Sequence, residues 1–153
     1  MKYESKNECR FDNKLTAPQL TGVMHRSHLI NYLEAVAADV VWLTAPSGSG
    51  KTTLVADWLN HTRQKHIWLR LDTSDSNPDT FFYNLRQAIN YAFPGYANEI
   101  DAYTQEYMLA PITFAENLFK RLESFLPKGK ISLILDDYHE LTEDSLVHEL
   151  LGH

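Results

Sequence analysis

Cysteine is almost absent from this chain: among its 153 residues, only Cys9 carries a thiol. A single cysteine excludes a disulfide within the chain and fits a reducing compartment. No apolar run approaches the ~20 residues that a membrane-spanning helix needs. Residues 1–10 also lack the apolar core of a secretory signal. We therefore expect a cytoplasmic protein that makes no contact with a membrane.

Positive charge is also scarce. Fourteen Lys and Arg residues stand against 20 Asp and Glu residues, which gives a net charge of −6. There is no basic run, no helix-turn-helix pattern and no zinc-ligand spacing. Because a field of this sign repels polyanions, we expect no direct DNA binding by this chain. The length suits one domain, and we predict a polar, flexible N-terminus over residues 1–13 followed by a domain over residues 14–153.

The most informative stretch begins at Val40. Four apolar residues, Val40–Leu43, predict a buried strand. A loop of small residues then follows, and a helix opens behind it: Ala45-Pro46-Ser47-Gly48-Ser49-Gly50, then Lys51-Thr52-Thr53. This is the pattern of a phosphate-binding loop, except that Ala45 stands where the strict pattern has its first glycine.

The chemistry of phosphate binding explains these residue types. Gly48 and Gly50 let phosphate oxygens approach backbone N–H groups and can adopt positive φ. Lys51 would bring a positive charge to the β- and γ-phosphates, and Thr52 would offer a hydroxyl to Mg²⁺. We predict that residues 45–53 bind a nucleotide; the alternative is an ordinary Gly/Ser-rich turn between a strand and a helix.

A second motif, Ile131-Ser132-Leu133-Ile134-Leu135-Asp136-Asp137, is an apolar run that ends in two acids. It predicts another buried parallel strand. Ligands of open α/β sheets bind beyond the carboxyl ends of the strands. Asp136 is therefore a candidate Mg²⁺ ligand, and Asp137 a candidate to polarise an attacking water. The alternative is that the two acids only cap the helix that follows.

The remaining pattern alternates helices with strands. A strand is predicted over His66–Asp72, and helices from about Ser27, from Lys51, from Pro78, from about Thr113 and from Thr142 to about Leu151. Ser27 could cap the first of these helices. Residues 93–111 are expected to be an irregular connection. The alternation favours an α/β fold with a parallel sheet.

Several of these segments resemble the large ATP-binding LuxR-type transcriptional regulators. The resemblance is carried by Thr44–Leu54 and Leu135-Asp136-Asp137-Tyr138-His139, and it is supported by Trp68–Asp72 and by the lead-in from Lys14 to Arg26. It implies a signal-transduction ATPase of the STAND class. Such a protein has a P-loop NTPase fold, a three-layer parallel sheet flanked by helices. It rests with ADP and self-associates with ATP.

The resemblance also implies roles for individual residues. Lys51 and Thr52 would bind phosphate and Mg²⁺, with Asp136 as the Mg²⁺ acid. Asp137 and Lys51 would be the catalytic residues. Arg26 would flank the nucleotide base.

The chain departs from this family because it ends soon after Asp137. The family's next strand, which would lie between the strand before the phosphate loop and the strand that ends at Asp136, is absent. We therefore expect an incomplete, N-terminal part of the domain, the product of a truncated gene or a fragment. It should be marginally stable or self-associating, bind ATP or ADP with Mg²⁺, and hydrolyse ATP slowly or not at all.

Two other functions are considered. A small P-loop kinase would need a lid rich in arginine, and residues 93–111 contain none. A remnant that binds no nucleotide and acts only in protein interaction would keep the motifs as sequence alone.

Overall fold

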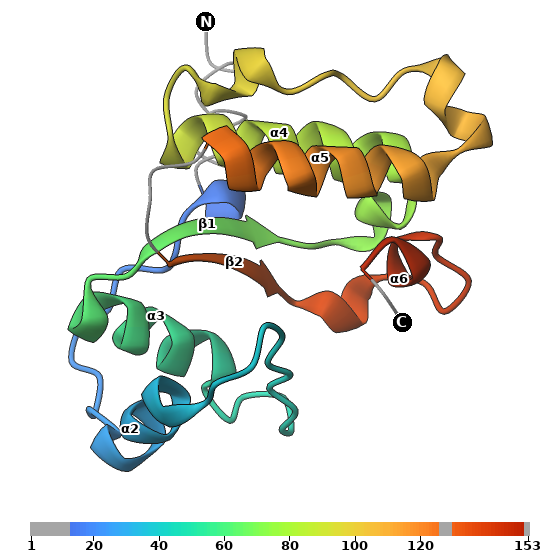
Figure 1. The fold of residues 1–153 in the computed structure, drawn as a ribbon. Coiled ribbons are helices and arrows are strands. Elements are labelled where there is room, and N and C mark those ends of the chain that lie inside the picture. The colour runs from blue at the N-terminus through green and yellow to red at the C-terminus, as the bar shows by residue number, and fades with distance from the viewer. Residues whose placement is uncertain (1–12, 126–129, 152–153) are drawn as a thin grey trace, which may run out of the picture. The chain divides into compact units, whose positions relative to one another are not determined.

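The computed structural model describes residues 13–125 and 130–151 (Figure 1). The chain divides into two compact units, one of Met1–Thr16 with His66–His153 and one of Ala17–Lys65. Each unit is described by itself. The predicted flexible N-terminus lies outside the described residues apart from Asn13, which is helical together with residues 14 and 15.

The first unit contains a two-stranded sheet of β1 (Lys65–Arg70) and β2 (Ile131–Asp136). The two arrows run in the same direction (Figure 1), and the amide of Leu71 donates to the carbonyl of Asp136 at 2.8 Å. This register brings the ends of both strands to one edge of the sheet. The strands predicted over His66–Asp72 and from Ile131 are confirmed, although β2 is half-buried along its whole length rather than buried.

Two helices, α4 (Pro78–Ala92) and α5 (Pro111–Phe125), cover one face of this sheet (Figure 1). Helix α4 begins as predicted, because Pro78 fits its first turn and the side chain of Asn77 accepts from the amide of Asp79 at 2.8 Å. Buried side chains of β1, α4 and α5 form one core, which includes Ile67, Leu69, Phe81, Phe82, Leu85, Ile89, Phe114 and Leu118. Short 3₁₀ turns occupy Thr73–Ser76, Tyr96–Glu99, Gln105–Leu109 and Tyr138–Glu140.

The last predicted helix is shorter in the structure. Helix α6 covers only Val147–Leu150, whereas the sequence predicts a helix from Thr142 to about Leu151. The amide of Thr142 donates to Oγ of Ser76 at 2.9 Å, and Oγ of Ser145 donates to the carbonyl of Ser76 at 2.9 Å. These hydroxyl contacts hold the segment in a non-helical path, because they offer its backbone an alternative to helical bonds.

The second unit contains α2 (Ser27–Ala35) and α3 (Lys51–Thr62), which pack against each other. Their buried side chains are Ile30, Leu54, Ala56 and Leu59. Helix α2 starts where the sequence predicts, but Ser27 is not its cap. Arg26 occupies that position and makes no side-chain capping bond.

The predicted strand at Val40–Leu43 is wrong. Residues 40–46 form no strand, and the four apolar side chains are between 38 and 63% exposed. A strand needs a neighbour for its backbone groups, and the sheet of the described residues consists of β1 and β2 alone.

The combination of helices with a small parallel sheet confirms the α/β class. The three-layer P-loop arrangement stays a prediction. Within the described part of the chain, no helix is long and apolar enough to cross a membrane.

Candidate functional site

The predicted phosphate loop leads directly into a helix. Gly48 has φ 75° and Gly50 has φ 81°, and both values lie in the left-handed region, which glycine adopts without the steric cost of a Cβ. The amide of Ser49 closes a turn onto the carbonyl of Pro46 at 3.2 Å. Gly50 is the N-cap of α3, and its carbonyl accepts the helical bond from Leu54 at 2.9 Å. The glycines thus stand where the backbone requires them.

Two cationic side chains hold the loop by its carbonyl groups. Nζ of Lys51 donates to the carbonyls of Ala45 at 2.7 Å and Pro46 at 3.2 Å. The guanidinium of Arg26 donates to the carbonyls of Gly50 at 2.6 Å and Ser49 at 3.2 Å. Arg26, which the family resemblance implies beside a nucleotide base, lies here on the loop backbone. A contact to backbone carbonyls leaves no trace in side-chain patterns, so no pattern in the sequence indicates it.

The residue before Arg26 is held as well. Nδ1 of His25 lies 2.9 Å from Oδ2 of Asp57, and the ring of His25 lies 5.4 Å from that of His61. Asp57 and His61 are one turn apart on α3, so they present one face to His25. Residues 25 and 26 are therefore tied to both α3 and the loop in front of it.

The two loop glycines provide a test of the Arg26 contact. Substitution by alanine should cost about 1–2 kcal/mol at either position, because both are left-handed. A Cβ at Gly50 would lie 3.0 Å from Nη2 of Arg26, whereas one at Gly48 would meet nothing within 4 Å. Gly50→Ala should therefore cost up to about 1 kcal/mol more than Gly48→Ala in urea unfolding, since it disturbs a hydrogen bond.

The control is the same pair of substitutions in an Arg26→Ala background. In that background the two glycine substitutions should lower the free energy of unfolding by the same amount. If Gly48→Ala and Gly50→Ala lowered the free energy of unfolding equally with Arg26 in place, its guanidinium would not restrain the loop.

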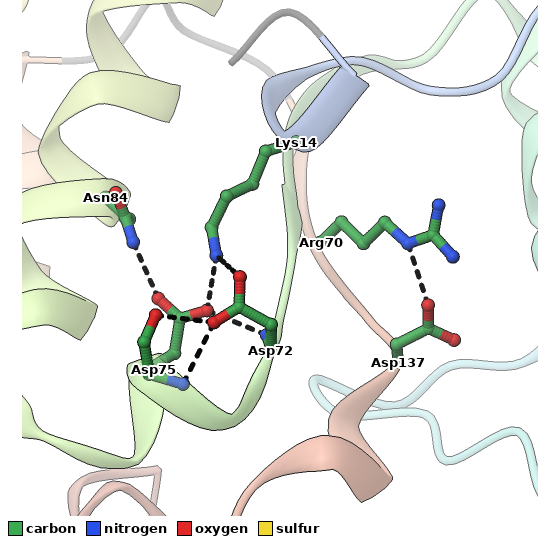
Figure 2. A network of polar contacts seen from close by, with 7 residues as sticks. Lys14, Arg70, Asp72, Asp75, Asn84 and Asp137 are labelled. Atoms are coloured by element: carbon green, nitrogen blue, oxygen red, sulfur yellow. Dashed lines mark hydrogen bonds and ion pairs between the residues drawn. The ribbon is translucent and has the colours of Figure 1, made fainter. Parts of the chain in front are cut away.

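The two predicted acids lie at the end of β2, in the other unit. Asp136 is half-buried. Asp137 has a left-handed backbone, with φ 56° and ψ 36°, and makes no side-chain capping bond to the turn that follows. Its Oδ2 instead accepts from Nε of Arg70 at 2.8 Å (Figure 2). The capping role considered for Asp137 is therefore wrong, and Arg70 is a neighbour that the sequence did not predict.

A polar network around the buried carboxylate of Asp75 lies close by in the same unit (Figure 2). Asp75 is 0% exposed and accepts from Nζ of Lys14 at 2.7 Å, from Nδ2 of Asn84 at 2.7 Å and from the amide of Asp72 at 2.8 Å. Lys14 also donates to Oδ2 of Asp72 at 2.7 Å. Burial raises the pKa of Asp72, but hydrogen bonds from Lys14 and Ser74 and the charge of Lys14 outweigh it and lower this pKa from 3.8 to about 2. The network ties Lys14 and Asn84 to the residues that directly follow β1.

The predicted site residues thus fall into two groups. The first group, Arg26, Ala45, Pro46, Ser47, Gly48, Ser49, Gly50, Lys51, Thr52 and Thr53, belongs to the unit of residues 17–65, while Asp136 and Asp137 belong to the other. The described residues contain no cluster of three or more His, Cys, Asp or Glu side chains that could hold a metal. A Mg²⁺ site that uses Thr52 and Asp136 stays a prediction. A surface hollow of about 400 Å³ is lined by Asp101, Asn117, Lys120, Arg121 and Ser124, and none of these belongs to either motif.

Comparison with known proteins finds relatives of this chain among transcriptional regulators. The chain is 34% identical over 144 residues to the HTH-type transcriptional regulator MalT of Yersinia enterocolitica, a match that covers 91% of this chain and 15% of that protein. It is 32% identical over 143 residues to the MalT proteins of Yersinia pestis and Yersinia pseudotuberculosis, with the same coverage. The chain is homologous to MalT. It spans about 15% of the length of these relatives.

Two further comparisons give no match. No family model matches the chain. No solved structure matches it significantly. The relationship therefore rests on sequence similarity to MalT proteins.

Proposed function

We propose that this chain is the nucleotide-binding part of a MalT-like regulator, and that residues 45–53 bind ATP or ADP with Mg²⁺. The observation that carries the proposal is the geometry of the loop. Two left-handed glycines lead into the N-terminus of α3, and Lys51 reaches back across the loop to the carbonyl of Ala45 at 2.7 Å. The partial positive charge of a helix N-terminus and its backbone N–H groups suit phosphate.

Lys51 has a defined task in this proposal. Its ammonium group has three donors and a flexible stem, so it can exchange a loop carbonyl for a phosphate oxygen without refolding the loop. Arg26 holds the carbonyls of Ser49 and Gly50, which keeps the turn in shape while Lys51 moves. In this proposal the backbone of the loop stays fixed while the ammonium group of Lys51 moves.

Asp136 and Asp137 enter the proposal through the sequence motif. Each motif would supply a Mg²⁺ ligand, the hydroxyl of Thr52 in one and Asp136 in the other, and Asp137 would orient a water. Within the two motifs, Lys51 and Mg²⁺ are the groups that would stabilise transition-state charge, and hydrolysis is therefore proposed to be slow or absent. Nucleotide identity would then act as a signal that biases two states of the protein, in keeping with homology to a transcriptional regulator.

The test is thermal unfolding with and without Mg²⁺ and ATP or ADP. A ligand at 100 times its dissociation constant should stabilise the fold by about 2.7 kcal/mol. Lys51→Ala should abolish this stabilisation. Lys120→Ala is the matched control, since it removes the same charge from an exposed position on α5.

The outcomes separate the proposal from its main alternative. An upward shift that survives in Lys120→Ala and is lost in Lys51→Ala would support a nucleotide site at the loop. A folded protein that shows no shift would mean that the motifs persist only as sequence, as in a remnant that acts through protein interaction.

A further inference from the structure

Arg26 holds two consecutive peptide units of the phosphate loop. Its guanidinium donates to the carbonyl of Ser49 at 3.2 Å and to the carbonyl of Gly50 at 2.6 Å. A peptide unit is planar and almost always trans, so its N–H group points away from its C=O group. The carbonyl of Ser49 shares a unit with the amide of Gly50, and the carbonyl of Gly50 shares one with the amide of Lys51. Arg26 therefore sets the direction of two amides at the start of α3.

The residue before Arg26 is anchored further along the same helix. Nδ1 of His25 lies 2.9 Å from Oδ2 of Asp57. Because an ionised carboxylate can only accept, Nδ1 carries the hydrogen of this bond. The ring of His61, one turn further along α3, lies 5.4 Å from the ring of His25. These contacts fix the chain at His25 relative to the helix that starts at the loop.

The backbone of Arg26 lies between two restraints. Its carbonyl accepts from the amides of Leu29 at 3.0 Å and Ile30 at 3.1 Å, as the N-cap of α2, and His25 precedes it. An arginine side chain has many rotamers. The guanidinium therefore reaches the same two loop carbonyls reliably only while the backbone that carries it stays in place.

We propose that Asp57 is a positioning residue for the phosphate loop and that it acts through His25 and Arg26. While Asp57 holds His25, the guanidinium of Arg26 stays on its two carbonyls. The amides of Gly50 and Lys51 then keep the direction that a phosphate requires. The inference rests on the proposed function, which places phosphate at this loop, and all of its residues belong to one compact unit.

The sign of the effect separates positioning from simple electrostatics. Asp57→Asn removes a negative charge, and charge alone would then let an anion bind more tightly. Positioning predicts weaker binding, because the bond to His25 loses its charge assistance and the loop amides lose their fixed direction. The two interpretations therefore predict opposite changes in the dissociation constant.

The test is equilibrium titration of the full chain with ADP in EDTA, so that no metal takes part. Asp57→Asn should raise the dissociation constant about two- to fivefold, the scale of a partly exposed ion pair. Asp57→Glu should lose less, because it keeps a carboxylate. His25→Ala should match Asp57→Asn, and the double variant should lose no more than either, since residues that act as a unit are not additive.

Asp39→Asn is the matched control, since it removes the same charge from an exposed position of the same unit. It should not weaken binding. The variants should fold, because the side chains of His25 and Asp57 are 44% and 19% exposed and partly exposed pairs contribute little to folding.

Each other outcome contradicts the inference. If Asp57→Asn bound ADP as tightly as wild type, or if Asp57→Glu lost as much as Asp57→Asn, the carboxylate would not position the loop. If the losses multiplied in the double variant, Asp57 would not act through His25. If wild type bound ADP only with Mg²⁺, the inference would fall and the proposed function would stand. If wild type and Lys51→Ala bound none under either condition, both would fail.

Discussion

Replacing Asp75 with alanine is expected to lower the free energy of unfolding by about 3–5 kcal/mol, the cost of breaking a buried charge pair from one side. The carboxylate is 0% exposed and accepts three hydrogen bonds. Alanine would leave the ammonium of Lys14, the amide of Asp72 and the amide nitrogen of Asn84 without this partner. The loss is a large part of a typical domain's stability, which is about 5–15 kcal/mol.

The measurement is urea unfolding followed by circular dichroism, with two comparison variants. Asp144→Ala removes the same charge from an exposed position and should change stability by less than about 0.5 kcal/mol. Asp75→Asn keeps the shape and one acceptor and should fall between the two. A loss below about 1 kcal/mol in Asp75→Ala would mean that the network is not held as tightly as a buried charge pair requires.

The parts of the fold that the sequence predicts well are those set by neighbouring residues. Strands β1 and β2 appear as short apolar runs, and α4 begins at Pro78 behind the Asn77 cap. Gly48 and Gly50 have the positive φ that a phosphate loop was expected to use. In each case the physical cause lies within a few residues of its effect, so one sequence is enough to find it.

Apart from the misplaced cap at Ser27, the errors and omissions involve partners that are distant in sequence. Val40–Leu43 has the composition of a strand, but pairing depends on a neighbouring strand that its own residues do not specify. The segment from Thr142 does not begin a helix, because the amide of Thr142 donates to the hydroxyl of Ser76, 66 residues away in the sequence. Arg70 and Asp137 are 67 residues apart, and Lys14 and Asp75 are 61 apart. Single-sequence patterns have no means of matching such pairs.

Replacing Phe82 with alanine is expected to lower the free energy of unfolding by as much as replacing Asp75 with alanine. Phe82 is 2% exposed, and its ring lies 5.4 Å from that of Phe81, 4.9 Å from that of Tyr103 and 4.8 Å from that of Phe114. It thereby joins α4, the irregular connection and α5. Phe82→Ala should cost about 3–5 kcal/mol, because it forfeits the transfer energy of the ring and leaves a cavity among side chains that relax only in part.

Tyr83→Ala is the matched control, since it removes an aromatic ring from the next position of the same helix, where 56% of the residue is exposed. Its loss should stay below about 1 kcal/mol, as expected for a surface position. Phe82→Leu should retain much of the stability, because it keeps most of the apolar volume. If Phe82→Ala and Tyr83→Ala lowered the free energy of unfolding equally, the packing of α4 against α5 would not be the core of this unit. The sheet edge that carries Arg70 and Asp137 would then need another source of rigidity.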